Sequence, residues 1–256
     1  MMAKRKILKI DLRKRKKSEE EDFLAVDKLI NIFVNGEYFV TLMASPRNIR
    51  ELAIGHLLGQ GIINALEDIE HVSIRGKNVN LRTKAEIQLE ATKFPKVIPT
   101  ACGASEDIIE LLGKSGMLKL AVKFSAENIL DAFKSLHSAS RIFKKSGGTH
   151  AAALFTWDGK LKFCIEDVGR HNAVDKVIGR GLLEGVNFTM SFMISTGRLS
   201  ADMVIKCVRA GIPLVASKAA PLESGVLAAE MSGLTLVGFV RGSRMNVYTR
   251  PERVKF

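Results

Sequence analysis

The sequence predicts an α/β protein in which a smaller N-terminal α+β part precedes the main domain. Between residues 146 and 247, strand-like apolar runs alternate with segments of helical periodicity. This alternation predicts a mostly parallel sheet with helices on both faces. The earlier part contains an Asn-Gly pair between two apolar runs, which is a strong hairpin signal. With 256 residues, 46% of them hydrophobic and 26% charged, the chain can bury a full core as one large or two small domains.

The basic charge of the chain is concentrated at its N-terminus. Residues 1–17 contain nine Lys or Arg and one Asp, hence +8 of the formal +12, and the acidic residues 19–22 follow. Blocks of like charge are usually disordered, so we expect residues 1–22 to form a basic, disordered tail. Nucleic-acid binding by this tail is an alternative that predicts a steeply salt-dependent affinity. We expect neither nucleic acid nor a membrane as a partner.

Cysteine use and hydropathy indicate a cytoplasmic location. Cys102, Cys164 and Cys207 are odd in number and widely spaced, which argues against a disulfide framework and for a reducing compartment. No secretory signal follows the basic start, and no run reaches the roughly 18 apolar residues of a membrane span.

We expect residues 23–122 to form the N-terminal part. Two strands, 29–34 and 38–42, flank the Asn35-Gly36 turn, and short strands follow between 69 and 89. Between them, Ser45 is the expected N-cap of a helix that has Pro46 at its first position and ends near Gly59 or Gly61. His56 lies on the apolar face of this helix, which favours a core histidine over a metal ligand.

Cys102 stands in a glycine-containing loop ahead of a helix that Ser105 is expected to cap. Partial positive charge at a helix N-terminus stabilises a thiolate, and Gly103 lets another molecule approach the sulfur. The alternative is a buried, inert cysteine, as most lone cysteines are. Cys164 lies in an apolar strand and Cys207 on a helix stripe, so we interpret both as structural.

The main domain is expected to span residues 123–256. Its expected helices are 125–145, 171–183 and 221–231, with one more after residue 200, and its expected strands are 151–155, 160–165, 191–194, 213–216 and 234–240. Asp158-Gly159 reads as a tight turn between the first two strands. The segment 166–176, between a strand and a helix, is rich in groups that donate, accept or carry protons, as expected of a site. The alternative is that Asp167 caps the helix and the others are solvated.

Three loops of this domain suit the oxygen atoms of phosphate groups. They supply hydroxyls, amides that follow glycine, and arginines: Gly148-Thr149-His150, Ser195-Thr196-Gly197-Arg198 and Arg241-Gly242-Ser243-Arg244. If they line one crevice with the 166–176 segment, they would hold a large phosphate-bearing ligand. The sequence has neither a Walker phosphate loop nor a dinucleotide glycine fingerprint, which argues against an ordinary nucleoside triphosphatase or dehydrogenase.

A set of motifs in order along the chain resembles the FdhD family, the formate dehydrogenase accessory sulfurtransferases. The motifs are Val34-Asn35-Gly36, Pro46 with residues 51–58, Cys102-Gly103, residues 147–152, Glu166-Asp167-Val168-Gly169-Arg170-His171-Asn172-Ala173-Val174-Asp175-Lys176, Gly197-Arg198 and residues 238–244. The similarity runs from about residue 28 to the C-terminus, and the 166–176 string is its most specific part.

The resemblance implies a function. Members take sulfur from a cysteine desulfurase as a cysteine persulfide and pass it to the molybdenum cofactor, bis-molybdopterin guanine dinucleotide, before that cofactor enters formate dehydrogenase. It also implies a homodimer and a cytidine-deaminase-like three-layer domain. Cys102 matches the first cysteine of the family's Cys-Gly-x-Cys-Gly loop, whereas Ser105 occupies the second cysteine position, so a resolving thiol is missing.

The expected site follows from these two lines of reasoning. Cys102 is the expected catalytic residue. The resemblance places cofactor binding at Phe239, Val240, Arg241, Gly242, Ser243 and Arg244, and a guanine nucleotide such as GDP is expected to bind in the cofactor's place. From the phosphate-suited loops and the 166–176 segment we add Thr149, His150, Asp167, Arg170, His171, Asn172, Gly197 and Arg198. No metal ligands are expected.

Two alternative functions use the same residues. A zinc-dependent nucleoside deaminase would need His-x-Glu and Pro-Cys-x-x-Cys motifs, but the glutamate is missing after His150 and Cys102 has no partner three residues along. A cofactor-binding chaperone without sulfur chemistry is favoured by Ser105, and predicts that maturation of formate dehydrogenase needs Arg241 and Arg244 but not Cys102.

Overall fold

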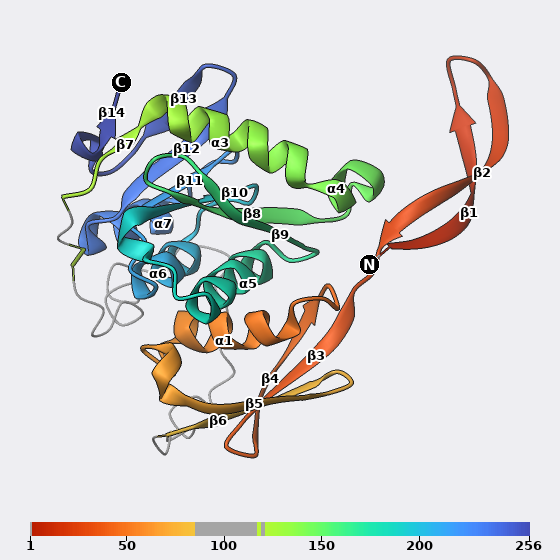
Figure 1. The fold of residues 1–256 in the computed structure, drawn as a ribbon. Helices are drawn as coiled ribbons and strands as arrows, with labels where there is room; N and C mark the ends of the chain where they lie inside the picture. Colours follow the sequence, from red (N-terminus) through yellow and green to blue (C-terminus); the bar gives the residue numbers. More distant parts are fainter. Residues whose placement is uncertain (1, 85–116, 119–120) are drawn as a thin grey trace.

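The computed structural model describes residues 2–84, 117–118 and 121–256, and its elements are arranged in layers (Figure 1). The main sheet has the strand order β13-β12-β11-β10-β8-β9. Its strands are β8 (His150–Thr156), β9 (Leu161–Asp167), β10 (Ser191–Ser195), β11 (Leu214–Ser217), β12 (Thr235–Arg241) and β13 (Arg244–Val247). The predicted α/β class is confirmed, and the finer cytidine-deaminase-like assignment stays a prediction.

The prediction of a mostly parallel sheet is wrong. Only the pairs β10–β11 and β11–β12 are parallel, whereas β8–β9, β8–β10 and β12–β13 are antiparallel. The reason is local, because the short turns at Gly159 and Gly242, both with positive φ, send the chain straight back beside the strand it has left. Such a reversal produces an antiparallel pair, and a parallel pair needs a longer crossover.

Helices cover both faces of the main sheet, as predicted. One face packs against α3 (Ala126–Ala139) around Phe155 and Phe192. The other packs against α5 (Arg170–Leu183), α6 (Ala201–Arg209) and α7 (Glu223–Ser232). The expected helix over 125–145 breaks at Ser140, where α4 (Arg141–Ser146) begins. Shorter elements are the 3₁₀ turns Leu66–Asp68, Phe188–Met190 and Pro251–Arg253, and the paired strands β7 (Phe124–Ser125) and β14 (Val254–Lys255).

The N-terminal part contains a second sheet with one helix on its inner face. The sheet has the order β4-β3-β6-β5, with β3 (Lys28–Val34), β4 (Glu37–Ala44), β5 (Ile69–Arg75) and β6 (Asn78–Thr83). The expected hairpin is confirmed, since Asn35 and Gly36 have φ of 52° and 88° as its turn requires. The expected strand region beyond residue 84 lies outside the described residues.

Helix α1 (Ile49–Gln60) joins the two parts of the chain. It ends at Gly61 as expected, but its N-cap is Asn48 rather than Ser45. Ser45 is instead engaged with the loop after β9, where its backbone N–H donates to Asp167 Oδ2 at 3.0 Å. α1 lies against α5, and both belong to one hydrophobic core that includes residues from Ile30 to Leu236. The predicted parts 23–122 and 123–256 therefore share a core.

The prediction that residues 1–22 are disordered is wrong for residues 2–22. These residues form most of a hairpin of β1 (Met2–Asp11) and β2 (Lys16–Ala25) that projects from the body (Figure 1). The register places basic residues opposite acidic ones, such as Arg5 opposite Asp22 and Lys6 opposite Glu21. The basic residues of β1 are therefore balanced by the acidic run in β2, whereas the five basic residues 13–17 are not.

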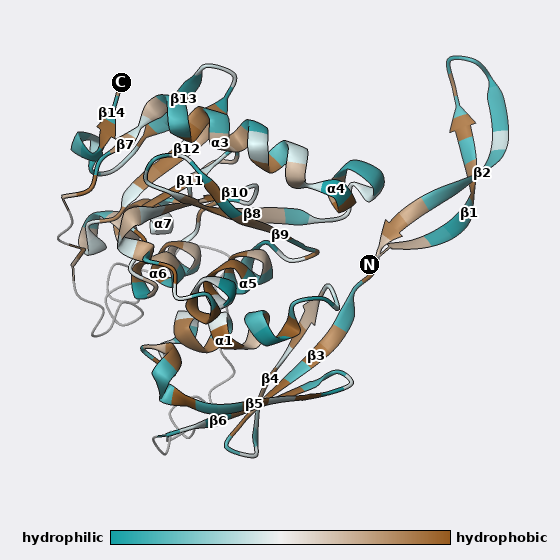
Figure 2. Ribbon diagram, viewed as in Figure 1, coloured by the Kyte–Doolittle hydropathy of each residue, from teal (hydrophilic) through white to brown (hydrophobic). Residues whose placement is uncertain are grey.

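Hydropathy follows this arrangement. The strands of the main sheet are coloured mostly as hydrophobic, whereas the projecting hairpin has long hydrophilic stretches (Figure 2). Within the ranges given above, no helix combines the length and the apolar character that crossing a membrane requires.

Candidate functional site

The sheet topology brings the predicted site segments to one edge of the main sheet. The parallel strands β10 and β12 end there, so Thr196 and Arg241 lie at the same edge. β8 is antiparallel to β10 and begins at this edge, which brings His150 beside Thr196. β9 is antiparallel to β8 and ends there, so the N-terminus of α5 lies at the edge as well. Ligands in α/β sheets gather where strands end in this way.

Two adjoining cavities open at this edge, and we call them the paired cavities. The first, of about 520 Å³, is lined by Leu136, His137, Ser140, Phe143, Gly147, Gly148, Thr149, His150, Ala151, Val168, Thr196 and Lys218. The second, of about 540 Å³, is lined by Leu130, Phe133, Lys134, His137, Ser138, Lys218, Val240, Arg241 and Gly242. His137 and Lys218 border both cavities. The phosphate-suited loops at 148–150, 196 and 241–242 therefore border one continuous region.

Lys218 and His137 were not among the predicted site residues. Lys218 follows β11, which lies between β10 and β12 and ends at the same edge. The rule that sites gather at strand ends would have singled out Lys218, although no hydroxyl–glycine–arginine pattern surrounds it. His137 is on the last turn of α3, and no sequence signal connects it to the edge of the sheet.

His150 is held in the first cavity as a neutral imidazole. Its Nδ1 lies 3.2 Å from Thr196 Oγ1, which also accepts a hydrogen bond from the Ala151 N–H at 3.0 Å. Burial lowers the pKa of His150 below its ordinary value of 6.5, and the nearby Arg170 lowers it further. At neutral pH the ring is therefore a hydrogen-bonding group without charge.

Arg170 and His171 occupy the first turn of α5 and line neither of the paired cavities. The Arg170 side chain packs against Gly197. A Cβ at Gly197 would lie only 2.7 Å from the Cβ of Arg170. The Nε2 atom of His171 lies 2.7 Å from Asp202 Oδ2, and this pair, with the Ser200 hydroxyl, holds the pKa of Asp202 well below its ordinary value despite burial. These contacts fix the start of α5 to the loop that leads into α6.

Asp167 and Asn172 are buried and hold the loop between β9 and α5, which we call the site loop. The Asp167 carboxylate is 0% exposed and accepts from Lys176 Nζ at 2.5 Å, from the Gly169 N–H at 2.8 Å and from Asn172 Nδ2 at 3.1 Å. Asn172 Nδ2 also donates to the Met43 carbonyl at 2.7 Å. Neither side chain borders the paired cavities, and the contacts of both position the loop between β9 and α5.

The 239–244 segment combines an unusual backbone with exposed charge. Phe239 has φ of 51° at a bulge of β12, and Gly242 has φ of 58° in the turn to β13. The Arg241 guanidinium lies 5.4 Å from the centre of the Phe239 ring, a cation–π distance. Val240 is buried against α3, whereas Arg241, Gly242, Ser243 and Arg244 are exposed, as is Arg198. Arg198, Ser243 and Arg244 lie at the edge of the sheet without lining either of the paired cavities.

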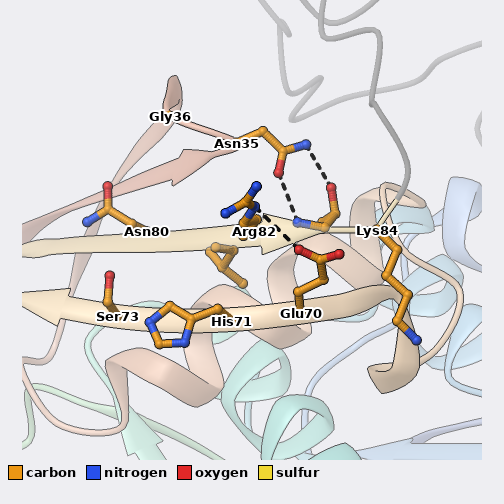
Figure 3. A pocket seen from close by; sticks show the side chains of 10 residues that line it. Asn35, Gly36, Glu70, His71, Ser73, Asn80, Arg82 and Lys84 are labelled. Atoms are coloured by element: carbon orange, nitrogen blue, oxygen red, sulfur yellow. Dashed lines mark hydrogen bonds and ion pairs between the residues drawn. The ribbon is translucent and has the colours of Figure 1, made fainter.

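A third cavity, of about 560 Å³, lies on the N-terminal sheet (Figure 3). Four of its polar side chains form two pairs, with Arg82 Nε 3.3 Å from Glu70 Oε2 and Asn35 Nδ2 donating to Thr83 Oγ1 at 2.8 Å. It contains none of the predicted site residues, and we assign no function to it.

The predicted nucleophile, Cys102, and its neighbour Ser105 lie outside the described residues. Cys164 and Cys207 are described, and burial raises the pKa of each thiol to about 12. A thiol with such a pKa is protonated at neutral pH and is a poor nucleophile, which agrees with the structural role predicted for both. Across residues 2–84, 117–118 and 121–256, no three His, Cys, Asp or Glu side chains are grouped as metal ligands would be.

Comparison with known proteins decides the family. The model of the FdhD/NarQ family matches residues 25–255. The chain belongs to the FdhD/NarQ family. Among FdhD relatives, the sulfur carrier protein FdhD of Methanothermobacter thermautotrophicus is 41% identical over 88% of each chain, and that of Sulfolobus acidocaldarius is 39% identical over 93% of each. A solved structure from Desulfotalea psychrophila, assigned as a formate dehydrogenase accessory protein, superimposes with a TM-score of 0.82 and 28% identity over 99% of both chains.

Proposed function

We propose that this FdhD-family protein is a sulfur carrier for formate dehydrogenase. In this proposal Cys102 takes sulfur from a cysteine desulfurase as a persulfide and passes it to bis-molybdopterin guanine dinucleotide before that cofactor enters the enzyme. The names of the relatives support the carrier role. The high thiol pKa of the other two cysteines supports the choice of Cys102. We further propose that the protein acts in the cytoplasm as a homodimer.

The first step transfers the outer sulfur of the desulfurase persulfide to the Cys102 thiolate. The Cys102 thiolate attacks the outer sulfur of the desulfurase persulfide, and a new S–S bond forms as the bond to the desulfurase cysteine breaks. The desulfurase cysteine leaves as a thiolate, so no external oxidant is needed. Because Ser105 stands where a second cysteine is usual in the family, the persulfide on Cys102 has no resolving thiol at that position.

Loading with sulfur tests this step. After incubation with a cysteine desulfurase and cysteine, the intact mass of the protein is expected to rise by one sulfur atom, and Cys102→Ala is expected to show no such rise. Cys164→Ala is the matched control and should load normally, because that thiol is protonated and largely buried. Sulfur that appears equally on the Cys102→Ala variant would remove Cys102 from the proposal.

The cofactor is proposed to lie along the paired cavities. Lys218 and Arg241 border the second cavity and can offer positive charge to a pyrophosphate group, while the neutral His150 and Thr196 offer hydrogen bonds in the first. Bis-molybdopterin guanine dinucleotide combines pyrophosphate groups with polar rings, so it matches these linings.

GDP binding tests the placement of the cofactor. Lys218→Ala and Arg241→Ala are each expected to weaken GDP binding by about 10- to 100-fold, the loss that follows from removing one charged hydrogen bond. Titration calorimetry measures this, with Arg75→Ala on the exposed surface of β5 as the control that removes an equal charge far from the edge. An affinity that falls only in the control, or in none of the variants, contradicts the placement.

A second candidate function is a cofactor-binding chaperone without sulfur chemistry, which Ser105 favours. It predicts that Cys102→Ala still supports maturation of formate dehydrogenase, while Arg241→Ala and Arg244→Ala do not. The sulfur-carrier proposal predicts that all three variants fail.

A further inference from the structure

The hairpin β1–β2 is an arm with a fixed base and a free tip. At the base, the Nζ atoms of Lys4 and Lys145 lie 5.6 and 5.7 Å from the centre of the Phe23 ring, and Lys145 belongs to α4. Ala25 lies beside Gly148, which borders the paired cavities. The rest of the arm projects away from the body (Figure 1). The match to the family model begins at residue 25, where the arm ends, so the family model does not include the arm.

Charge is balanced along the arm but not at its tip. The strands bring four basic residues, Lys4, Arg5, Lys6 and Lys9, close to the four acidic residues 19–22, including ion pairs Lys4–Glu21 at 2.9 Å and Lys9–Glu20 at 3.0 Å. The stalk is therefore neutral. Residues 11–17 contain five Lys or Arg and one Asp, a net charge of +4 at the turn. All five basic residues there are exposed.

The tip also exposes apolar side chains. Leu12, in the turn, is 85% exposed, and Leu8 and Ile10, which share one face of β1, are 58% and 55% exposed. A two-stranded hairpin with such residues in water is only marginally stable, so a surface that covers them stabilises it. A surface that covers the tip must therefore combine an apolar layer for the leucine and isoleucine side chains with negative charge for the five basic residues.

We propose that the tip of this arm binds an anionic lipid surface. The apolar residues enter the boundary between headgroups and acyl chains, and the basic residues contact the anionic headgroups. Nucleic acid offers phosphates but no apolar layer for Leu12, and residues 10–17 contain no aromatic side chain on which a base could stack. The basic residues alone do not predict a membrane partner. The exposed Leu12 beside five basic residues is the observation that supports binding to a lipid surface.

Vesicle binding tests this proposal with the full chain. The protein is expected to sediment with phosphatidylcholine vesicles that contain about a third of phosphatidylserine, and not with pure phosphatidylcholine. Each basic residue near such a surface strengthens binding roughly fivefold, so Arg13→Gln/Lys14→Gln/Arg15→Gln should weaken it about 100-fold. Leu12→Ser should weaken it about tenfold through lost apolar burial.

Two comparisons make the outcome decisive. Lys77→Gln/Lys162→Gln/Lys255→Gln removes the same charge from exposed positions on the body and should change vesicle binding far less. A short duplex DNA competes in a parallel assay. Equal loss in both triple variants, no preference for anionic vesicles, or tighter binding to duplex that is indifferent to Leu12→Ser would each overturn the proposal. Melting temperatures confirm that the body of each variant is folded, and none of these measurements depends on sulfur transfer.

Discussion

Gly179→Ala is expected to lower the free energy of unfolding by about 3 kcal/mol or more, because it drives α1 away from α5. A Cβ at Gly179 would lie 1.9 Å from the Glu51 carbonyl oxygen and 2.9 Å from the Gly55 N–H nitrogen. Gly55 faces α5 in the same way, since its Cβ would lie 1.8 Å from the Asp175 carbonyl oxygen. The obstacles are backbone atoms of a packed helix, so no side chain can rotate to make room.

Gly185→Ala is the control for this substitution, since Gly185 follows the end of the same helix. Gly185 has φ of 62°, and no atom lies within 4 Å of the position that a Cβ would take. Its alanine variant should therefore lose only about 1 kcal/mol of stability, the cost of a left-handed backbone for a residue with a side chain. Urea unfolding followed by circular dichroism measures both variants. Equal midpoints for the two would show that α1 and α5 do not pack as closely as these distances require.

Asp175→Ala is expected to destabilise the protein by about 3–5 kcal/mol, because it leaves the ammonium group of Lys206 buried without its counter-charge. The Asp175 carboxylate is 2.5 Å from Lys206 Nζ and 3.1 Å from His56 Nδ1, and Lys206 is only 4% exposed. This cluster ties together α1, α5 and α6 beneath the site loop. His56, which the sequence predicts to be a core histidine, is partly buried, with its side chain 12% exposed beside Asp175.

An exposed pair provides the control for Asp175→Ala. Asp131→Ala breaks the Lys134–Asp131 pair, which lies in solvent, and should cost no more than about 0.5 kcal/mol. The double variant Asp175→Leu/Lys206→Met should recover most of the loss, because it removes both buried charges. If Asp175→Ala and Asp131→Ala unfold at the same urea concentration, the buried pair does not stabilise the fold.

Acid titration gives a second measurement on the same residue. Burial alone would raise the pKa of Asp175, but the Lys206 ammonium and His56 outweigh it and hold that pKa below its ordinary value of 3.8. The stability that this ionised carboxylate contributes is therefore fully present above pH 3.8 and is lost as the pH falls below it. Asp175→Ala lacks this contribution, so the stability of the variant should fall less steeply in acid.

Local patterns predicted individual elements well where short-range physics dominates. The Asn35-Gly36 hairpin, the end of α1 at Gly61 and the turn at Gly159 each depend on residues that tolerate positive φ. Ser45 was misassigned as a helix cap because its true partners, Asp167 and Lys176, are more than a hundred residues away. The sequence singled out the 166–176 segment as a whole. In the structure Asp167, Asn172, Asp175 and Lys176 are buried, whereas Arg170 and His171 stay partly exposed at the edge of the sheet. The packing of α5 against α1 decides which residues of the segment are buried.

The sequence by itself determined the α/β class, the family-specific motifs, the candidate nucleophile and the phosphate-suited loops, because each depends on residue types over a few neighbouring positions. The tertiary structure decided which of these meet. It gathered His150, Thr196 and Arg241 at one edge, added Lys218 and His137, withdrew Asp167 and Asn172 into the interior, and turned the charged N-terminus into an arm. These outcomes depend on strand direction, register and burial, which arise between residues far apart in the chain.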